Sequence, residues 1–257
     1  MRSRTLWGLL LLAVLVSGCA AQAERDVLYQ ASTINALLEG VYDGTITLGE
    51  LQKHGDFGIG TFDGLDGEMI LLDGCFYQVR GDGKVYRPGP GATTPLATVA
   101  FFVADHALAA DGPFDLSDLE SLLDRTTPER NVPVAIRITG TFKRVKTRSV
   151  PKQEKPYPRL IDVTAKQPTF EFHDVKGTLV GFRFPAYMKG IGVPGYHLHF
   201  LTADRSGGGH VLEIETEAMR IEMDVKREVF IALPRTEMFN RADLSKDKEA
   251  EVRKAEQ

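Results

Sequence analysis

The chain has 257 residues, of which 43% are hydrophobic and 26% are charged, a composition that excludes fibrous and intrinsically disordered proteins. Its length allows a sizeable core and either one large domain or two small ones. The formal net charge is -4 and no basic run stands out, so nucleic acid is not an expected partner.

The first residues predict an export signal. Arg2 and Arg4 give a positive start, and the apolar run at residues 6–16 is shorter than the about 20 residues that span a bilayer, as in the h-region of a secretory signal. The run ends in Val-Ser-Gly-Cys, which is typical of a bacterial lipobox. Residues 1–18 are therefore the expected lipoprotein-type signal peptide, with a lipid on Cys19 and the mature chain on the periplasmic side of the membrane.

Ordinary secretion is the alternative, with cleavage at an Ala-x-Ala-like site in residues 20–23. In the lipoprotein interpretation, residues 19–26 form a linker to the fold. A lipid on Cys19 leaves Cys75 as the one remaining cysteine of the sequence, which excludes a disulfide framework. Cys75 lies in an apolar, strand-like run, where a buried thiol is expected.

Short helices and hairpins are expected in the first part of the mature chain. Residues 32–38 predict a helix that ends at Gly40, and Thr47 is placed to cap a second short helix. Asp-Gly and Gly-Asp pairs then predict tight hairpin turns. These turns are expected near residues 64–67, 73–74 and 81–83.

Strands flank one clear helix in the middle of the chain. Residues 96–104 and the β-branched, alternating residues 132–145 predict strands, and Ser117 begins a capping box for a helix between them. The proline-rich stretch RSVPKQEKPYPRL follows. It predicts a boundary near residue 150 between an N-terminal α/β domain (27–150) and a C-terminal domain (151–257).

The C-terminal part predicts mostly strands, so the expected fold is α+β and strand-rich, with mixed or antiparallel sheets and few helices. The charged tail at 243–257 is helix-prone. Strands are expected at residues 177–184, 196–202, 210–215, 219–225 and 229–233.

Three of the six histidines lie close together, at His197, His199 and His210. Alternation along a strand puts His197 and His199 on one face. A hairpin that pairs residue 199 with residue 210 places His210 directly across from them, about 4.5–5.5 Å away at Cβ. Three nitrogen ligands with an open fourth position are the arrangement of a catalytic zinc site. The pattern therefore predicts a histidine-bearing β-hairpin that binds a metal ion.

Other interpretations of the histidines stay open. His-x-His in a strand also fits a polar outer face, and it occurs in cupins, which carry a glutamate a few residues later where this chain has Asp204. Three imidazoles also accept iron, nickel or copper, so the pattern does not fix the metal. His54, His106 and His173 stand alone and are expected to be ordinary surface or core residues.

Three specific stretches of the chain are STINALLEGVYDG, HGDFGIGTFDGLDGEMILLDGCFYQV and PGYHLHFLTADRSGGGHVLE. In these motifs the chain resembles the alpha-acetolactate decarboxylases, and the likeness runs from about residue 27 to residue 233. The resemblance implies a dimeric, two-domain α/β or α+β carboxy-lyase. It would convert 2-acetolactate, a 2-hydroxy-3-keto acid, to acetoin and carbon dioxide with one zinc ion.

The resemblance also implies the roles of particular residues. From the residues alone, Glu68 is typical of a strand edge, Arg148 belongs to a basic strand face with Arg144 and Lys146, and the tail is a solvated helix. By resemblance, the zinc ligands are His197, His199 and His210, the catalytic residues are Glu68, Arg148 and a C-terminal glutamate best matched by Glu256, and the substrate-contacting threonine is Thr61.

The chemistry suits these residue types. The hydroxyl and ketone oxygens of the substrate can chelate one cation, which stabilises the enediolate left when carbon dioxide departs. Arg148 can hold the carboxylate with a two-pronged fork, and Glu68 can act as acid or base toward the hydroxyl. A zinc-dependent hydrolase would not need Arg148. A non-catalytic lipoprotein that binds metal or keto acid would tolerate the loss of both Glu68 and Arg148.

Overall fold

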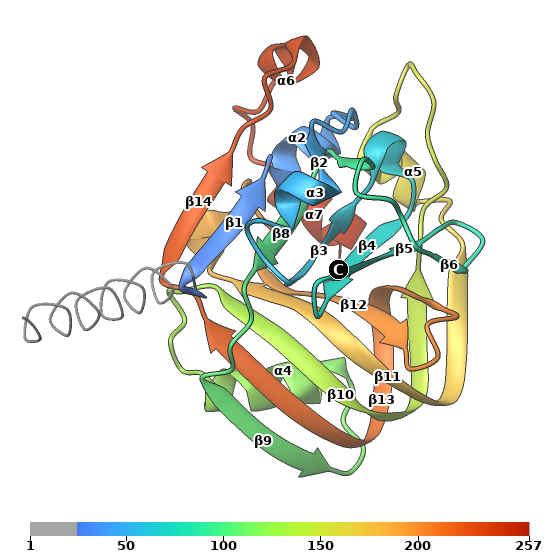
Figure 1. The fold of residues 1–257 in the computed structure, drawn as a ribbon, viewed down its shortest axis with the longest axis vertical. Helices are drawn as coiled ribbons and strands as arrows, with labels where there is room; N and C mark the ends of the chain where they lie inside the picture. Colours follow the sequence, from blue (N-terminus) through green and yellow to red (C-terminus); the bar gives the residue numbers. More distant parts are fainter. Residues whose placement is uncertain (1–24, 257) are drawn as a thin grey trace, which may run out of the picture.

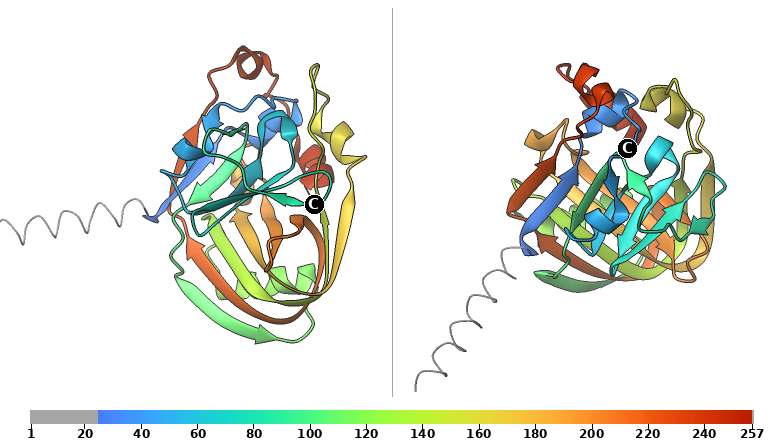
Figure 2. Two further views of the ribbon diagram at one scale, coloured as in Figure 1. Left: turned by 45° about the vertical axis from the view of Figure 1, so that its right-hand side comes forward. Right: turned by 45° about the horizontal axis from the view of Figure 1, so that its top comes forward.

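The computed structural model describes residues 25–256, so the expected signal peptide and Cys19 lie outside the described residues. Figures 1 and 2 show two β-sheets packed against each other, with most of the helices gathered at one end of the molecule. Within residues 25–256, no helix is long and apolar enough to cross a membrane.

The first sheet has seven strands in the order β14-β1-β8-β3-β4-β5-β6. Its one parallel pair is β1 with β14, and the other neighbours are antiparallel. The strands are β1 (Val27–Ala31), β3 (Phe57–Thr61), β4 (Glu68–Leu72), β5 (Cys75–Val79), β6 (Val85–Tyr86), β8 (Ala97–Ala100) and β14 (Glu228–Ala232).

The second sheet has five antiparallel strands in the order β10-β11-β12-β13-β9. Strand β10 also pairs with β13, so β10, β11, β12 and β13 form a closed ring of pairings. The strands are β9 (His106–Asp111), β10 (Val134–Arg148), β11 (Thr169–Phe184), β12 (Gly195–Thr202) and β13 (Gly208–Val225). A separate small ladder joins β2 (Ile46–Thr47) to β7 (Thr93–Thr94).

The helices are short, and α4 is the longest of those described. They are α2 (Ile34–Leu38), α3 (Leu48–Leu51), α4 (Leu116–Thr126), α5 (Leu160–Thr164), α6 (Glu237–Arg241) and α7 (Glu249–Glu256), with 3₁₀ turns at η1 (Asp63–Leu65) and η2 (Ala186–Met188).

Side-chain alternation along the strands of the second sheet builds its two-sided core. In β12, Leu198 and Phe200 point to the face that α4 covers, where they pack with Leu119 and Leu123 of that helix. Leu201 points to the opposite face and joins the core between the two sheets. The odd-numbered residues of β12, including His197 and His199, therefore lie on the side of the seven-stranded sheet.

A third core lies under the helices at one end of the molecule. Leu37 of α2, Leu160 of α5 and Val252 of α7 pack there, together with Tyr42 and Val150. The helix α7 comes from the last residues of the chain, and Figure 1 shows it in the middle of the molecule, close to β4. This core therefore brings the C-terminus beside the sheets.

The strand-rich α+β fold with mixed and antiparallel sheets is confirmed, and so is the histidine-bearing hairpin, β12–β13. The expected division at residue 150 stays a prediction, and strand membership crosses it. Strands β9 and β10 precede residue 150 but belong to the second sheet, whereas β14 follows it and belongs to the first.

Two local expectations were wrong. The cap of α4 is Asp115, whose carboxylate accepts from the Asp118 N–H, so the helix begins before Ser117. Aspartate is as good a cap as serine, and both stand at suitable positions in the sequence. The strands expected at 210–215 and 219–225 are one continuous strand, β13, because pairing with β10 spans the residues between them.

Candidate metal centre and active site

The β12–β13 hairpin brings the three histidines together. His199 lies directly opposite His210 in the register that the sequence predicted. One ring nitrogen from each of His197, His199 and His210 lies within 4.8 Å of the others, and His197 Nε2 is 3.0 Å from His210 Nδ1. His199 and His210 are each 1% exposed, so water does not compete for their ring nitrogens.

Backbone carbonyls fix the tautomers of two of these rings. His199 Nδ1 lies 2.9 Å from the Met69 carbonyl, so this nitrogen carries the hydrogen and donates it. His210 Nε2 lies 3.1 Å from the Glu256 carbonyl and donates in the same way. The lone pairs are therefore left on His199 Nε2 and His210 Nδ1, which face the centre of the cluster.

The donor set fits a divalent metal ion. Burial lowers the pKa of all three imidazoles, that of His199 to about 3, which keeps them neutral with free lone pairs. His199 Nε2 is buried and has no hydrogen-bond partner among the described residues. A buried polar atom left unpaired costs about 1–3 kcal/mol, and a metal ion would satisfy it.

Glu256, in the last turn of α7, adds an oxygen to this cluster. Its Oε2 lies 3.7 Å from both His197 Nε2 and His210 Nδ1. Burial raises the pKa of its carboxyl, while Arg148 opposes the rise. Of the three glutamates in α7, Glu256 is the one that lies beside the histidines. Glu251 instead pairs with Arg159, and Glu249 with Arg253.

Arg148, the last residue of β10, is 3% exposed. Its guanidinium donates to Glu256 Oε2 at 2.9 Å, to the Ala255 carbonyl at 2.5 Å and to Gln167 Oε1 at 2.9 Å. In contrast, Arg144 and Lys146 lie near the surface and pair with Glu213. The basic stretch therefore divides into a solvated part and one buried arginine beside the histidines.

Glu68 and Thr61 face each other across the β3–β4 hairpin. Glu68 Oε2 is 3.6 Å from His199 Nε2, and Glu68 Oε1 is 3.8 Å from Arg148. Burial raises the pKa of Glu68 to about 8, Arg148 lowers it, and Glu256 raises it further. The Thr61 hydroxyl donates to the Gly67 carbonyl at 2.7 Å, which leaves its oxygen free to accept.

Glycine at position 67 is needed to deliver Glu68 to the site. Gly67 has φ +84, which side chains rarely adopt, and a Cβ there would lie 2.2 Å from the Val79 carbonyl oxygen. The tight turn lets β4 start with Glu68 pointing at His199.

Two of the histidines, together with Arg148 and the two glutamates, line one small cavity of about 30 Å³, which we call the inner cavity. Its apolar walls come from α2, α5 and the loops around β3 and β8. A water molecule needs about 10–15 Å³ of such volume, so the inner cavity has room for very few. The residues that line it are Leu37, Gly60, Thr61, Leu65, Glu68, Leu96, Arg148, Val150, Leu160, His197, His199 and Glu256.

Some of the site was not found from the sequence. Gln167 holds Arg148, and the Met69 carbonyl orients His199, yet no sequence signal marks either contact. The remaining histidines lie elsewhere. His54 stacks on Tyr29, His106 is in β9 and His173 is exposed on β11.

The family model described as alpha-acetolactate decarboxylase matches residues 28–246. The chain belongs to the alpha-acetolactate decarboxylase family. The alpha-acetolactate decarboxylase of Methanosarcina mazei is 50% identical over 231 residues, covering 90% of this chain and 80% of that protein. The alpha-acetolactate decarboxylase of Methylococcus capsulatus is 44% identical over 233 residues, covering 91% of this chain and 90% of that protein.

Solved structures agree with this family assignment. The alpha-acetolactate decarboxylase of Bacillus subtilis strain 168 superposes with a TM-score of 0.88 at 42% identity, covering 90% of this chain and 99% of that one. A Staphylococcus aureus protein of unknown function, described as similar to alpha-acetolactate decarboxylase, superposes with a TM-score of 0.86 at 34% identity, covering 90% of this chain and all of that one (100%).

Proposed function

We propose that the protein decarboxylates 2-acetolactate to acetoin and carbon dioxide at a zinc ion held by His197, His199 and His210. Membership of the family supports the decarboxylase activity, which is that of a carboxy-lyase. The observation that carries the metal centre is the convergence of three neutral imidazoles, those of His199 and His210 buried and that of His197 partly buried, and His199 has an unpaired nitrogen. Glu256 is placed to offer an oxygen to the same ion.

A divalent ion bound there supplies Lewis-acid stabilisation of the negative charge that develops on the substrate oxygens as carbon dioxide leaves. Arg148 binds the substrate carboxylate, because it is the one buried guanidinium within reach of both Glu68 and Glu256 among the described residues. A planar guanidinium holds a carboxylate through two parallel hydrogen bonds and so fixes which carbon–carbon bond is broken.

Glu68 moves the proton in this proposal. With its pKa raised to about 8, its carboxyl can hold a proton near neutral pH, and a neighbouring cation lowers that pKa again. Glu68 Oε2, beside His199, is therefore suited to accept the hydroxyl proton of the substrate and to return it to the product. The carboxylate leaves as neutral carbon dioxide, so the product needs one further proton, which solvent supplies when the site opens. The Thr61 oxygen accepts a hydrogen bond from the substrate and orients it.

The apolar walls of the inner cavity exclude water from this chemistry. Leu37, Leu65 and Leu160 surround the charged groups, so the interactions of Arg148 and Glu68 with the substrate act in a medium of low dielectric constant. Exclusion of water also favours protonation of the product from the Glu68 side alone, which would make one stereoisomer of acetoin.

The deciding experiment is acetoin release from racemic 2-acetolactate by the purified protein, compared with a chelated sample and with the chelated sample restored with zinc. We expect rapid release that the chelator abolishes and zinc restores. A folded, zinc-loaded protein that gives no acetoin above the spontaneous rate would overturn the proposal. Turnover of ester or amide substrates by that protein would favour the hydrolase, and zinc binding without any turnover would favour the binding protein.

The proposal extends to export and assembly. The sequence of residues 1–19 supports a lipid anchor at Cys19 on the periplasmic side, and ordinary secretion is the alternative. Exposed apolar side chains at the edge of the seven-stranded sheet, Val229, Phe230 and Leu233, support a homodimer. Mass spectrometry of the N-terminal peptide from wild type and Cys19→Ala tests the anchor, and sedimentation of the purified protein tests the dimer.

A further inference from the structure

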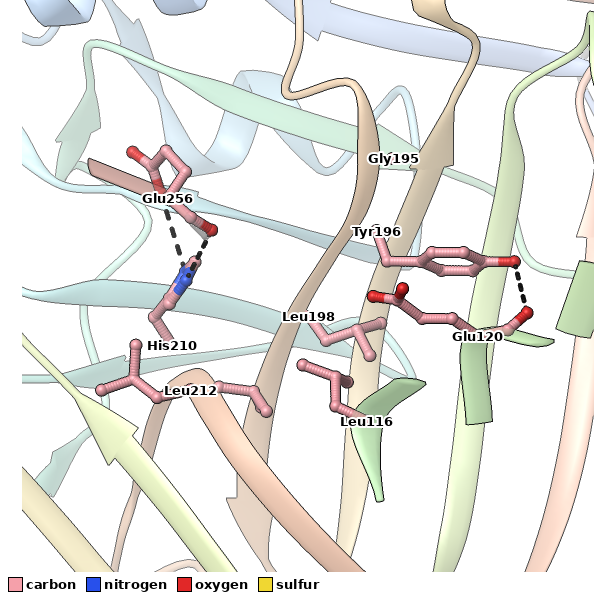
Figure 3. Close-up of a pocket in the computed structure, with 9 residues that line it drawn as sticks. Leu116, Glu120, Gly195, Tyr196, Leu198, His210, Leu212 and Glu256 are labelled. Carbon is pink, nitrogen blue, oxygen red and sulfur yellow. Dashed lines mark hydrogen bonds and ion pairs between the residues drawn. The ribbon is translucent and has the colours of Figure 1, made fainter. Parts of the chain in front are cut away.

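A second pocket, which we call the outer pocket, lies next to the histidines. Its volume is about 300 Å³, roughly ten times that of the inner cavity. Figure 3 shows Glu256 and His210 at one end and Tyr196 and Glu120 at the other, with leucines between them. The residues that line it are Leu116, Glu120, Gly195, Tyr196, Leu198, His210, Val211, Leu212 and Glu256.

Glu256 is the single described residue that lines both the outer pocket and the inner cavity. Its carboxylate reaches Arg148, and its backbone carbonyl accepts from His210 Nε2 at 3.1 Å. The last turn of α7 thus stands between a pocket wide enough for a small keto acid and a cavity that holds only a few water molecules. A substrate in the outer pocket would already lie beside His210, and movement of this turn would open the way to His197 and His199.

The contacts of Arg148 couple such a movement to an incoming anion. Two of its partners, the Ala255 carbonyl and the Glu256 carboxylate, belong to α7, and the third strong partner is Gln167. Withdrawal of α7 alone would take the nearest carboxylate away from a buried guanidinium and leave it with Gln167 and with Glu68 at 3.8 Å, which is unfavourable. A carboxylate that arrives from the outer pocket restores the lost ion pair, so the substrate itself favours the open state.

The attachment of α7 allows this movement. The helix has eight residues, all of them described, and Val252, Ala255 and Glu256 are its buried ones. Besides the contacts of its last turn with Arg148 and His210, the helix is held by the ion pair of Arg159 with Glu251 at 2.6 Å, and Lys248, the residue before it, pairs with Glu39. Segments with few buried apolar contacts open locally at low free energy.

We propose that the outer pocket is the entry subsite for the 2-hydroxy-3-keto acid substrate, and that the last turn of α7 is the gate through which the substrate carboxylate replaces Glu256 on Arg148. This inference rests on the proposed function for the identity of the substrate. The opening of the gate depends on the packing of Val252, and access to it depends on the width of the outer pocket at Leu116. It can therefore be tested without turnover.

The first test narrows the outer pocket with Leu116→Trp in the full-length zinc-loaded protein. The control is Ser121→Trp, which adds the same side chain on the exposed face of α4. The readouts are kcat/KM for acetoin formation and the rate at which the chelator 4-(2-pyridylazo)resorcinol extracts zinc. We expect both to fall by about tenfold in Leu116→Trp and to stay unchanged in the control. Unchanged rates in a Leu116→Trp protein that retains its zinc would overturn the proposal.

The second test loosens the gate with Val252→Ala. The control is Val163→Ala, which makes the same truncation in the same core but on α5. Zinc extraction requires opening, so its rate follows the open population, and we expect about a tenfold increase for Val252→Ala alone. Equal acceleration in both variants would mean general destabilisation and would contradict a gate at α7.

The two tests also separate this inference from the proposed function. Zinc extraction that responds to Leu116→Trp and Val252→Ala, in a protein that makes no acetoin, would support the gate and reject the decarboxylase. Acetoin formation with zinc extraction indifferent to both variants would support the decarboxylase and reject the gate. If Leu116→Trp fails to fold, Leu212→Phe narrows the same pocket from β13 and replaces it.

Discussion

Arg148 lies directly opposite His210 in the antiparallel register of β10 and β13. His210 lies opposite His199 in the register of β12 and β13. Backbone hydrogen bonds of the closed ring of strands therefore set the distances among the guanidinium and two imidazoles, and a slip of one residue would turn them to the wrong face. The histidines proposed to bind the metal and the arginine proposed to bind the substrate carboxylate lie on strands of the second sheet, whereas Glu256 lies on a short helix.

Loss of His199 should remove the metal. We expect His199→Ala to weaken zinc binding by more than about 100-fold, since even changes to the partners of metal ligands cost 10–100-fold. Zinc stabilises a protein that binds it, by about 2.7 kcal/mol at 100 times its Kd, so the zinc-dependent rise in Tm should disappear. Elemental analysis and thermal unfolding with and without zinc test this, with exposed His173→Ala as the control. A full zinc complement in His199→Ala would refute the ligand assignment.

We expect activity to depend on the two-pronged geometry of the Arg148 guanidinium as well as on its charge. Arg148→Lys keeps the positive charge but cannot make two parallel hydrogen bonds to a carboxylate, so we expect kcat/KM to fall by about 100-fold. Arg144→Lys, four residues earlier on the same strand but paired with Glu213 near the surface, should change little. Steady-state kinetics on zinc-loaded proteins make the comparison. Equal losses in both variants would show that Arg148 acts through the fold and not on the substrate.

Glu68→Gln should separate proton transfer from metal binding. The amide keeps the shape of the side chain but cannot exchange a proton, so we expect kcat to fall by about 10²–10⁴-fold while zinc content stays constant. Asp66→Asn, in the same turn but partly exposed beside Arg80, is the matched control. An active Glu68→Gln enzyme would assign the proton transfer to another group, with Glu256 the next to examine.

The anchor of α7 to α2 predicts a dependence of stability on acid pH. A hydrogen bond from Lys248, with help from the charges of Lys248 and Arg159, lowers the pKa of Glu39 from its usual value near 4.5. A lowered pKa in the folded state contributes stability that is present above the unfolded pKa and is lost as pH falls through the folded one. Glu39→Gln should therefore reduce the free energy of unfolding at about pH 6, with a difference from wild type that shrinks toward about pH 3.

Urea unfolding of the metal-free proteins between those pH values measures this difference. Metal-free protein is used because protonation of the histidines at acid pH would release bound zinc and change the stability for another reason. Glu50→Gln is the control, because Glu50 lies in α3 and its pair with Lys53 is exposed to solvent, which weakens it. A constant difference across the pH range would show that Glu39 is not stabilised by its charge.

The hairpin could be predicted from the sequence because every signal for it is local. His197 and His199 alternate, and glycines at 207–209 let the chain turn and return to pair residue 210 with residue 199. The turns around Gly67 and Gly74 were also predicted correctly, because their signals are adjacent residues in the sequence. At the start of α4 the local pattern gave the wrong cap, because Asp115 and not Ser117 accepts from the first turn of the helix.

The remainder of the site depends on contacts between distant parts of the chain. Alternation places Arg148 with Arg144 and Lys146, and burial alone distinguishes it. That burial comes from α7, more than a hundred residues later in the chain (107 between Arg148 and Ala255). The sequence pattern likewise predicts that Glu256 belongs to a charged, solvated helix, and only the packing of that helix on α2 and α5 shows that it is buried. Only the family resemblance marked these residues before the structure.

The chain order of the fold has a consequence for biosynthesis. Strand β1 pairs with β14, which lies near the other end of the chain, and the partners of Arg148 include the last described residues, Ala255 and Glu256. A ribosome releases the N-terminal strands first, so β1 has no parallel neighbour until β14 has also been synthesised. A chain that stops before β14 therefore lacks both this edge strand and the Glu256 carboxylate beside the three histidines.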